Sequence, residues 1–376
     1  MTSPLGLYIH IPWCVRKCPY CDFNSHRAPQ ALPEADYVDA LLRDLAVQAQ
    51  RVAGRTLQTV FIGGGTPSLF SGRAIGELLA GAARLLPLAP DAEITLEANP
   101  GTAEAGRFAD YRAAGVNRLS IGVQSLDDAS LRALGRIHDQ TQALAAVDMA
   151  RRAGFDNLNL DLMYGLPRQT PEAALADLEA LIGLGPEHLS WYQLTLEPNT
   201  LFHHDPPPLP DDDTLGEMME AGLERLSEAG FVQYEVSAHA RPGRQARHNL
   251  NYWRFGDYLG IGAGAHAKLT AADGTVRRYA RPRHPRDYLA DPVAPGSERR
   301  LSPDELPIEF FLNALRLSEG VPAALFEART GLPLAVVADR LAEARARGLL
   351  APDPERLRPT PLGQRFLNDL LAVLDA

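Results

Sequence analysis

Near its start the chain reads YIHIPWCVRKCPYCDF (Tyr8–Phe23), an apolar segment that runs directly into three cysteines. Gly6–Ile11 has the composition of a short buried strand. The spacing Cys14-x3-Cys18-x2-Cys21 then places the thiols in the loop that follows this strand. Ligand sites of β/α barrels lie at the carboxyl ends of the strands, so we expect the three thiolates to curl around a common centre there.

The three cysteines are the only ones among the 376 residues, and they lie within eight consecutive positions. This arrangement suits a disulfide framework poorly and indicates metal ligands. Electron-transfer iron–sulfur clusters usually have four cysteine ligands, so a four-iron cluster here would leave one iron for another ligand. The alternative is a structural zinc site completed by His10 or His26. Tyr20 would cover a cluster and influence its reduction potential, or serve only as filler.

A repeat of about 30 to 40 residues per strand-plus-helix unit organises most of the chain and predicts parallel strands with right-handed crossovers. We therefore expect an α/β protein with a partial (β/α)6 barrel. Gly115, Gly154 and Gly230 mark helix ends before the next strand. The expected strands are Gly6–Ile11, Thr59–Ile62, Glu93–Leu96, Arg118–Val123, Leu158–Met163 and Leu189–Leu196, and the clearest helices are Glu34–Ala53, Gln140–Ala153, Pro171–Leu184 and Thr214–Ala229.

The pattern changes after Tyr288, where residues 290–297 have a loop composition. We expect a core domain over residues 1–297 and a mostly helical, winged-helix-like domain over residues 298–376. Ser302 and Glu305 have capping-box spacing, with Pro303 at the first helical position. Helical patterns follow at Pro322–Thr330, Pro333–Arg347 and Pro361–Leu374, with a hairpin at Leu349–Thr360. Such a unit binds DNA or serves only for packing.

The amino-acid composition limits the classes of partner that this protein is expected to bind. The 47 acidic residues outnumber the 37 basic ones, for a formal charge of −10, which argues against a broad nucleic-acid or anionic-lipid surface. No apolar run approaches the roughly 18 residues that cross a bilayer, and no secretory signal pattern is present. We therefore predict a cytoplasmic protein without a transmembrane segment, whose 45% hydrophobic content is enough for a large core.

Further candidate ligand contacts follow other strands. Gly63-Gly64-Gly65-Thr66 comes straight after a strand, and glycine lets bare amides and the Thr66 hydroxyl approach a ligand, although a flexible turn would look the same. Polar residues occur at or after strand ends, where single examples are usually surface charges or helix caps. These polar residues are Glu97, Gln124, Arg136 and Asp161.

Together these motifs resemble the oxygen-independent coproporphyrinogen oxidase-like radical-SAM family. The resemblance implies a [4Fe–4S] cluster on Cys14, Cys18 and Cys21 with S-adenosylmethionine on its open iron, where one-electron cleavage gives a 5′-deoxyadenosyl radical. It also implies an electron-donor protein and a homodimer. By similarity, the S-adenosylmethionine contacts are Tyr8, Gly64, Gly65, Thr66, Glu97, Gln124, Arg136, Asp161 and Tyr192. The glycines of Leu259–His266 match a further family motif and lack dinucleotide-binding spacing.

Two departures separate this chain from the porphyrinogen-decarboxylating members. Those members carry a fourth cysteine where this chain has Phe23, and a long extension before the first strand. The sequence RHNLNYW (Arg247–Trp253) instead resembles a motif of the family's haem chaperone branch. His248 would ligate haem iron while Tyr252 and Trp253 cover the macrocycle. The alternative is a hydrogen-bonded core histidine. The adjacent histidines His203 and His204 are weaker haem candidates.

Three functions follow. The resemblance favours a chaperone that binds haem and transfers it to haem-accepting respiratory proteins, with the cluster and S-adenosylmethionine acting in transfer or regulation. Whether the radical-SAM centre also acts as an enzyme is open at this point. The second hypothesis is oxidative decarboxylation of coproporphyrinogen III in porphyrin biosynthesis. The third, a nucleic-acid-binding metalloprotein, would bind in a salt-sensitive way, which the net charge disfavours.

Overall fold

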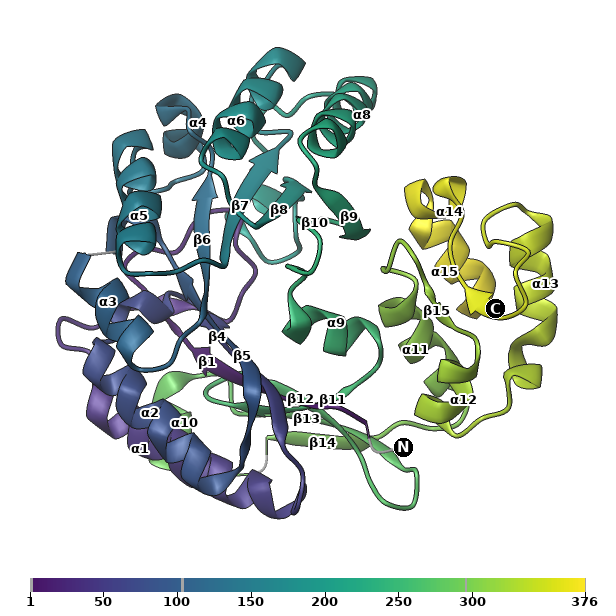
Figure 1. Ribbon diagram of the computed structural model, residues 1–376, viewed down its shortest axis with the longest axis horizontal. Coiled ribbons are helices and arrows are strands. Elements are labelled where there is room, and N and C mark those ends of the chain that lie inside the picture. The colour runs from purple at the N-terminus through teal and green to yellow at the C-terminus, as the bar shows by residue number, and fades with distance from the viewer. Residues whose placement is uncertain (1–2, 103–104, 295, 376) are drawn as a thin grey trace.

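A curved, open sheet forms the centre of the computed structural model, which describes residues 3–102, 105–294 and 296–375. Its parallel strands follow one another in chain order (Figure 1). They are β1 (Leu5–Ile11), β4 (Leu57–Gly64), β5 (Leu88–Ala98), β6 (Arg118–Gln124), β7 (Leu158–Tyr164) and β8 (His188–Gln193). β1 and β8 are not paired with each other, so the barrel is partial. The predicted α/β class and all six predicted strands are confirmed.

Helices cover the outer face of this arc because alternate strand residues there are aliphatic. Leu7 and Ile9 of β1, for example, are completely buried, as are Leu119 and Ile121 of β6. The flanking helices are α1 (Glu34–Gln50), α2 (Gly72–Leu85), α3 (Ala105–Ala113), α5 (Gln140–Arg152), α6 (Pro171–Gly183) and α8 (Asp212–Glu228), with the short α4 (Asp128–Ala133) between β6 and α5. The inner face of the same strands carries polar residues instead, and it is there that the cavity lies.

The sheet extends beyond the parallel block at both edges, to 12 strands. β11 (Asp257–Ile261) runs parallel to β1, and β12 (His266–Thr270), β13 (Val276–Ala280) and β14 (Ser297–Arg300) continue antiparallel. β10 (Ala238–Ala240) and β9 (Val232–Glu235) extend the other edge. The sequence prediction missed these strands, which are at most five residues long and lack sustained alternation.

Four short elements lie beside or within this sheet. β2 (Trp13–Cys14) and β3 (His26–Arg27) pair across the cysteine loop, so the loop is closed at its base. α10 (Pro285–Ala290) follows β13 and contacts α1. α9 (Arg247–Trp253) lies inside the arc, against β1, β4 and β11.

The C-terminal unit is mostly helical, as predicted. It contains α11 (Leu306–Ala314), α12 (Ala324–Thr330), α13 (Ala338–Ala346), α14 (Pro361–Arg365) and α15 (Leu367–Asp375). Both capping-box bonds between Ser302 and Glu305 are present, but residues 303–305 form a turn and the helix begins at Leu306. The predicted last helix breaks at Phe366, whose φ of −113° and ψ of 50° are not helical.

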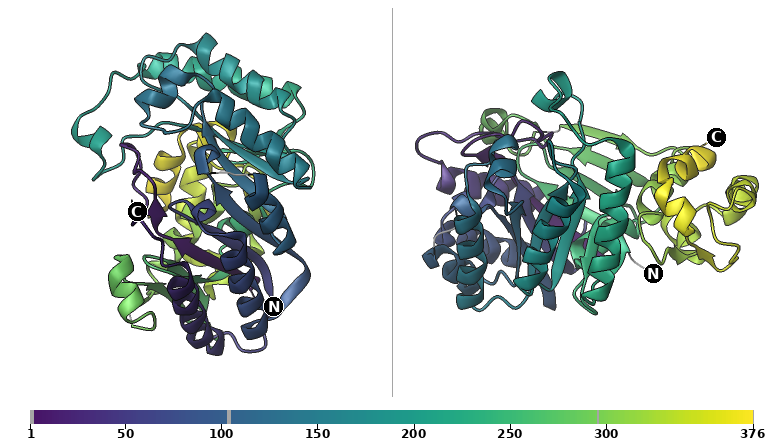
Figure 2. Two further views of the ribbon diagram at one scale, coloured as in Figure 1. Left: turned by 90° about the vertical axis from the view of Figure 1, so that its left-hand side faces the viewer. Right: turned by 90° about the horizontal axis from the view of Figure 1, so that it is seen from above.

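The predicted wing is reduced. Within Leu349–Thr360 a single bridge joins Leu350 to Pro359, while β16 (Arg356–Leu357) pairs with β15 (Val321–Pro322). The unit also shares its core with the sheet, since the buried rings of Phe310 and Phe326 belong to the cluster that includes Phe255. Figure 2 shows this unit beside the open edge of the arc. The predicted boundary at residue 298 falls within β14 and stays a prediction.

The sequence predicts no transmembrane segment. Within the described ranges, no helix is both long and apolar enough to cross a membrane.

Candidate functional site

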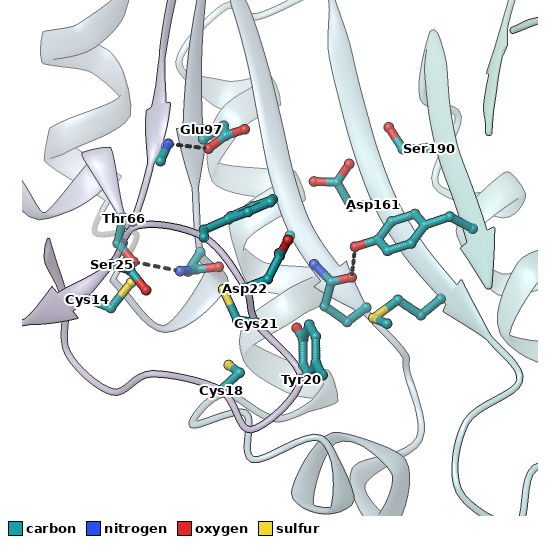
Figure 3. A pocket seen from close by; sticks show the side chains of 18 of the residues that line it. Cys14, Cys18, Tyr20, Cys21, Asp22, Ser25, Thr66, Glu97, Asp161 and Ser190 are labelled. Carbon is teal, nitrogen blue, oxygen red and sulfur yellow. Dashed lines mark hydrogen bonds between the residues drawn. The ribbon is translucent and has the colours of Figure 1, made fainter. Parts of the chain in front are cut away.

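A cavity of about 640 Å³ opens at the carboxyl ends of the parallel strands, on the inner side of the arc (Figure 3). It brings together most of the candidate site residues named from the sequence. Those that line it are Cys14, Cys18, Tyr20, Cys21, Gly64, Gly65, Thr66, Glu97, Gln124, Arg136, Asp161 and Tyr192. Tyr8, His248, Tyr252 and Trp253 are not lining residues.

The cysteine loop is fixed from below by His10 and Asn24. His10 Nε2 lies 2.8 Å from the Asn24 carbonyl oxygen, and the Asn24 side chain donates to the carbonyls of Ala263 and Arg283 at 3.0 and 2.8 Å. The predicted glycine motif at Leu259–His266 therefore supports the cysteine loop. His10 Nδ1 lies 2.8 Å from Tyr8 Oη, so both ring nitrogens of His10 are occupied.

The three thiols fit a cluster better than a zinc ion. Neither His10 nor His26, the candidates for a fourth zinc ligand, lines the cavity. In the part of the chain that the structure describes, no three His, Cys, Asp or Glu side chains are close enough to share one metal ion. A four-iron cube needs no such convergence, because each thiolate binds its own iron. The buried Ser25 hydroxyl lies beside Cys14 in Figure 3, and its hydrogen bond lowers the pKa of that thiol, against the larger effect of burial.

Hydrogen bonds from the loops after β4 and α4 reach two of the sulfurs. Thr66 Oγ1 lies 3.5 Å from Cys14 Sγ, and Arg136 Nη1 lies 3.8 Å from Cys18 Sγ. Burial raises the pKa of the Cys14 and Cys21 thiols. Iron binding at these positions therefore has to displace protons.

The glycine loop lies so close to the cysteine loop that side chains would not fit. Gly64 has a φ of +115°, and a Cβ there would come within 2.5 Å of the His10 ring. A Cβ at Gly65 would lie 2.5 Å from the Trp13 carbonyl oxygen. These contacts account for two of the three glycines.

One expectation about this loop is wrong. Its amides are not bare, because Gly64 N–H donates to Glu97 Oε2 at 3.0 Å, and the amides of Gly65 and Thr66 donate to the carbonyls of Ile11 and Trp13, each at 2.7 Å. The reason is that the pairing of β1 with β4 continues past the end of the strand. A ligand can therefore approach the backbone of this loop closely, but the amides of Gly64, Gly65 and Thr66 already donate to other groups.

Two carboxyl groups face each other across the cavity floor. Burial, reinforced by the nearby Asp161, raises the pKa of Glu97 to about 7. Burial also raises the pKa of Asp161, whose oxygens accept from Asn159 Nδ2 at 2.7 Å and Ser120 Oγ at 3.3 Å. Such groups accept hydrogen bonds from a ligand's hydroxyl or amino groups, and a cationic ligand would favour their ionised forms.

Arg136 and the two tyrosines form the side of the cavity nearest α4. Arg136 Nη2 donates to Asn99 Oδ1 at 2.6 Å and to the Gly122 carbonyl at 2.8 Å, which aims its other nitrogen at Cys18. Tyr192 Oη donates to Gln124 Oε1 at 2.8 Å. Burial raises the pKa of Tyr20, which therefore remains a neutral phenol beside the cysteines.

The α9 residues lie at the opposite, amino-terminal ends of the strands. His248 is 1% exposed, with Nδ1 2.8 Å from Thr59 Oγ1 and Nε2 2.7 Å from Tyr252 Oη. Burial lowers the pKa of His248 to about 3. This is the arrangement of a hydrogen-bonded core histidine, and neither ring nitrogen is free for iron. Trp253 packs under the guanidinium of Arg316, 4.4 Å from its ring centroid. Haem binding through His248 stays a prediction.

Several lining residues were not predicted. Asn99 stands two positions after Glu97, just past the end of β5, and donates to Thr66 Oγ1 at 2.9 Å, so the strand-end signal that indicated Glu97 could have indicated it too. Ser190 and Met163 alternate with buried residues on their strands, a signal that becomes readable only once the inner face is known. Arg316 comes from the C-terminal unit and carries no local signal.

Comparison with known proteins defines the class first. The sequence model of the Radical SAM superfamily matches residues 8–181, and that of the HemN C-terminal domain matches residues 301–366. The fold matches the solved structure of coproporphyrinogen III oxidase (HemN) from Escherichia coli, with a TM-score of 0.83 at 24% identity over 100% of this chain and 91% of that one. This is the fold of a radical-SAM protein.

Relatives of higher identity define the family. The protein named heme chaperone HemW of Escherichia coli K12 is 54% identical over 98% of this chain and 98% of its own length. The HemW protein of Haemophilus influenzae is 49% identical over 98% of this chain and 97% of its own length. The chain therefore belongs to the HemW family of radical-SAM proteins.

Proposed function

We propose that this protein is a haem chaperone that carries a [4Fe–4S] cluster on Cys14, Cys18 and Cys21, binds S-adenosylmethionine beside it, and passes haem to respiratory acceptor proteins in the cytoplasm. The observation that carries this proposal is the meeting of exactly three cysteines, a glycine loop and strand-end polar groups in one cavity. The relatives named heme chaperones supply the haem part of the proposal.

Different residues of the cavity would hold different parts of the two cofactors. The three thiolates bind iron, Glu97 and Asp161 accept from the ligand's polar hydrogens, and Arg136 compensates the negative charge of the cluster sulfurs. Bound together, the cluster and S-adenosylmethionine supply one-electron chemistry, which requires an electron-donor protein. The side chains supply position, charge and exclusion of water.

Anaerobic reconstitution tests the cluster. The wild-type protein should bind about four iron and four sulfide per chain, whereas Cys18→Ser should lose the cluster. Ser227→Ala, at an exposed position of α8 away from the cavity, leaves the site unchanged and is the matched control. A single zinc without sulfide in protein prepared without air would refute the cluster.

Haemin titration tests the chaperone function. The wild-type protein should give a saturable Soret shift and release haem to apo acceptor protein. Absence of saturable binding would refute the proposal. Turnover of coproporphyrinogen III to protoporphyrinogen under anaerobic reducing conditions would show instead that the protein belongs to the decarboxylating branch.

A further inference from the structure

The rim of the cavity carries exposed apolar side chains that the cofactors do not account for. Val15 is 47% exposed, Phe23 58% and Ile137 51%, and Leu201 is 70% exposed. Phe23 lines the cavity itself, while Val15 and Ile137 each adjoin a lining residue in the chain. A cluster of large exposed apolar groups around a cavity mouth indicates a binding surface.

The short helix α7 (Leu201–His204) is attached to the cysteine loop through Phe202, so the exposed Leu201 lies one residue from a contact with that loop. The backbone N–H of Phe202 donates to the Pro19 carbonyl at 3.0 Å, and the Phe202 ring lies 6.4 Å from the Tyr20 ring. The Thr200 side chain caps the helix by accepting from the His203 amide. α7 is therefore held beside the cysteines.

His203 on this helix is exposed and has one ring nitrogen fixed. Its Nδ1 lies 3.2 Å from the Leu196 carbonyl oxygen. A carbonyl accepts only from N–H, so in the neutral imidazole the proton would sit on Nδ1 and the lone pair on Nε2. Histidines that bind metals commonly show this arrangement, with a backbone carbonyl orienting the ring from the far side. His248, in contrast, has both ring nitrogens engaged.

Two cations complete the rim. Arg16 and Lys17 are exposed and line the cavity, and Lys17 Nζ donates to the Phe23 carbonyl at 3.0 Å. A positive charge is thus held beside the backbone of an exposed aromatic residue. A flat apolar ligand with two carboxylates and a metal centre would find a partner here for each of its parts.

We propose that haem binds on this rim, with iron on His203 Nε2, the macrocycle over Phe23 and Leu201, and the propionates toward Arg16 and Lys17. The proposal rests on the haem-chaperone function proposed above and assigns the site. It places haem beside the radical-SAM cavity rather than at α9, and it gives α9 a structural role in closing the amino-terminal end of the arc.

Haemin titration of full-length variants tests the assignment. His203→Ala should weaken haem binding at least tenfold and shift the Soret maximum, and free imidazole should restore the wild-type spectrum. His204→Ala, on the same exposed helix, is the matched control and should bind like wild type. The double variant Arg16→Gln, Lys17→Gln should weaken binding and reduce its dependence on ionic strength.

Three results would overturn the assignment. These are an unchanged affinity and spectrum of His203→Ala, loss of binding in His204→Ala, and loss of binding in a His248→Ala protein that is fully folded at the assay temperature by circular dichroism. Failure of the proposed function would look different, because the wild-type protein itself would then show no saturable binding.

Discussion

Replacing Glu97 by glutamine should stabilise the cluster-free protein and weaken its binding of S-adenosylmethionine. The pKa of Glu97 is raised to about 7 from an ordinary 4.5, chiefly by burial and then by Asp161. Folding therefore opposes ionisation, and the stability that the neutral form provides below about pH 4.5 is lost as the pH rises through 7. Each pKa unit corresponds to about 1.4 kcal/mol, so the charge costs roughly 3 kcal/mol at pH 8 and less than about 1 kcal/mol at pH 5.

Glutamine removes this cost and keeps the carbonyl oxygen that can accept from the Gly64 amide. Urea unfolding of both proteins under reducing conditions should therefore give a variant that is more stable by about 3 kcal/mol at pH 8 and nearly equal to wild type at pH 5. Equal stability at both pH values, or a less stable variant at pH 8, would refute the reasoning.

The binding assay separates the functional part of this prediction from the structural part. The affinity of the reconstituted wild-type protein for S-adenosylmethionine should rise as the pH crosses 7, because the ionised carboxylate is the stronger acceptor. The glutamine variant should bind more weakly and lose this rise. The ligand's own titration is common to both proteins, so the difference between them reports on Glu97. Parallel pH profiles would contradict a contact between Glu97 and the ligand.

Other substitutions test the supports of the site. Gly64→Ala should cost roughly 1–3 kcal/mol through strain at its φ of +115° and should impair cluster assembly, whereas Gly183→Ala, with open space around it, should do neither; melting curves and iron counts check both. Lys268→Met should cost about 1–2 kcal/mol in urea unfolding, because Asp257 loses one buried partner, at 3.0 Å, and keeps Arg55 at 2.8 Å. His248→Ala should lower the free energy of unfolding by roughly 2–4 kcal/mol through two lost hydrogen bonds and a cavity, and equal melting curves would contradict its core role.

The parallel block was predictable because its signals are local and repeated. Each strand from β1 to β8 is an apolar run bounded by turn residues, and helices such as α5 begin at a capping box, formed here by Asp139 and Gln142. The edge strands were not predictable, since β13 contains two arginines and β12 a buried lysine. Lys268 is tolerated there only because Asp257, on the neighbouring strand, neutralises it. A short stretch of sequence around Lys268 does not show that this residue will pair with Asp257.

The site residues likewise fall into two groups, those that the local sequence predicts and those that it does not. Residues that follow strand ends, such as Glu97 and Asp161, could be assigned to one face because parallel strands end on the same side. Contacts that depend on long-range packing could not be assigned. Arg316 reaches the cavity from the C-terminal unit, and His248 faces away from it, because α9 crosses the arc at the amino-terminal ends of the strands.

The polar inner face explains why α9 carries a histidine and a tyrosine. An arc of six strands leaves an interior that extends below the cavity, and its inward residues there include Thr59, Glu93 and Arg118. Buried polar groups need partners, and α9 supplies them: His248 binds Thr59, and the amides of Arg247 and His248 donate to Glu93, each at 3.0 Å. Arg118, 2% exposed and without an ion pair in the described ranges, adds a positive field that favours ionised Glu97 and Asp161 above it and neutral His248 below. Arg118 thus links the α9 motif electrostatically to the carboxylates of the cavity, so a substitution that changes the charge at α9 should also change the ionisation of Glu97 and Asp161.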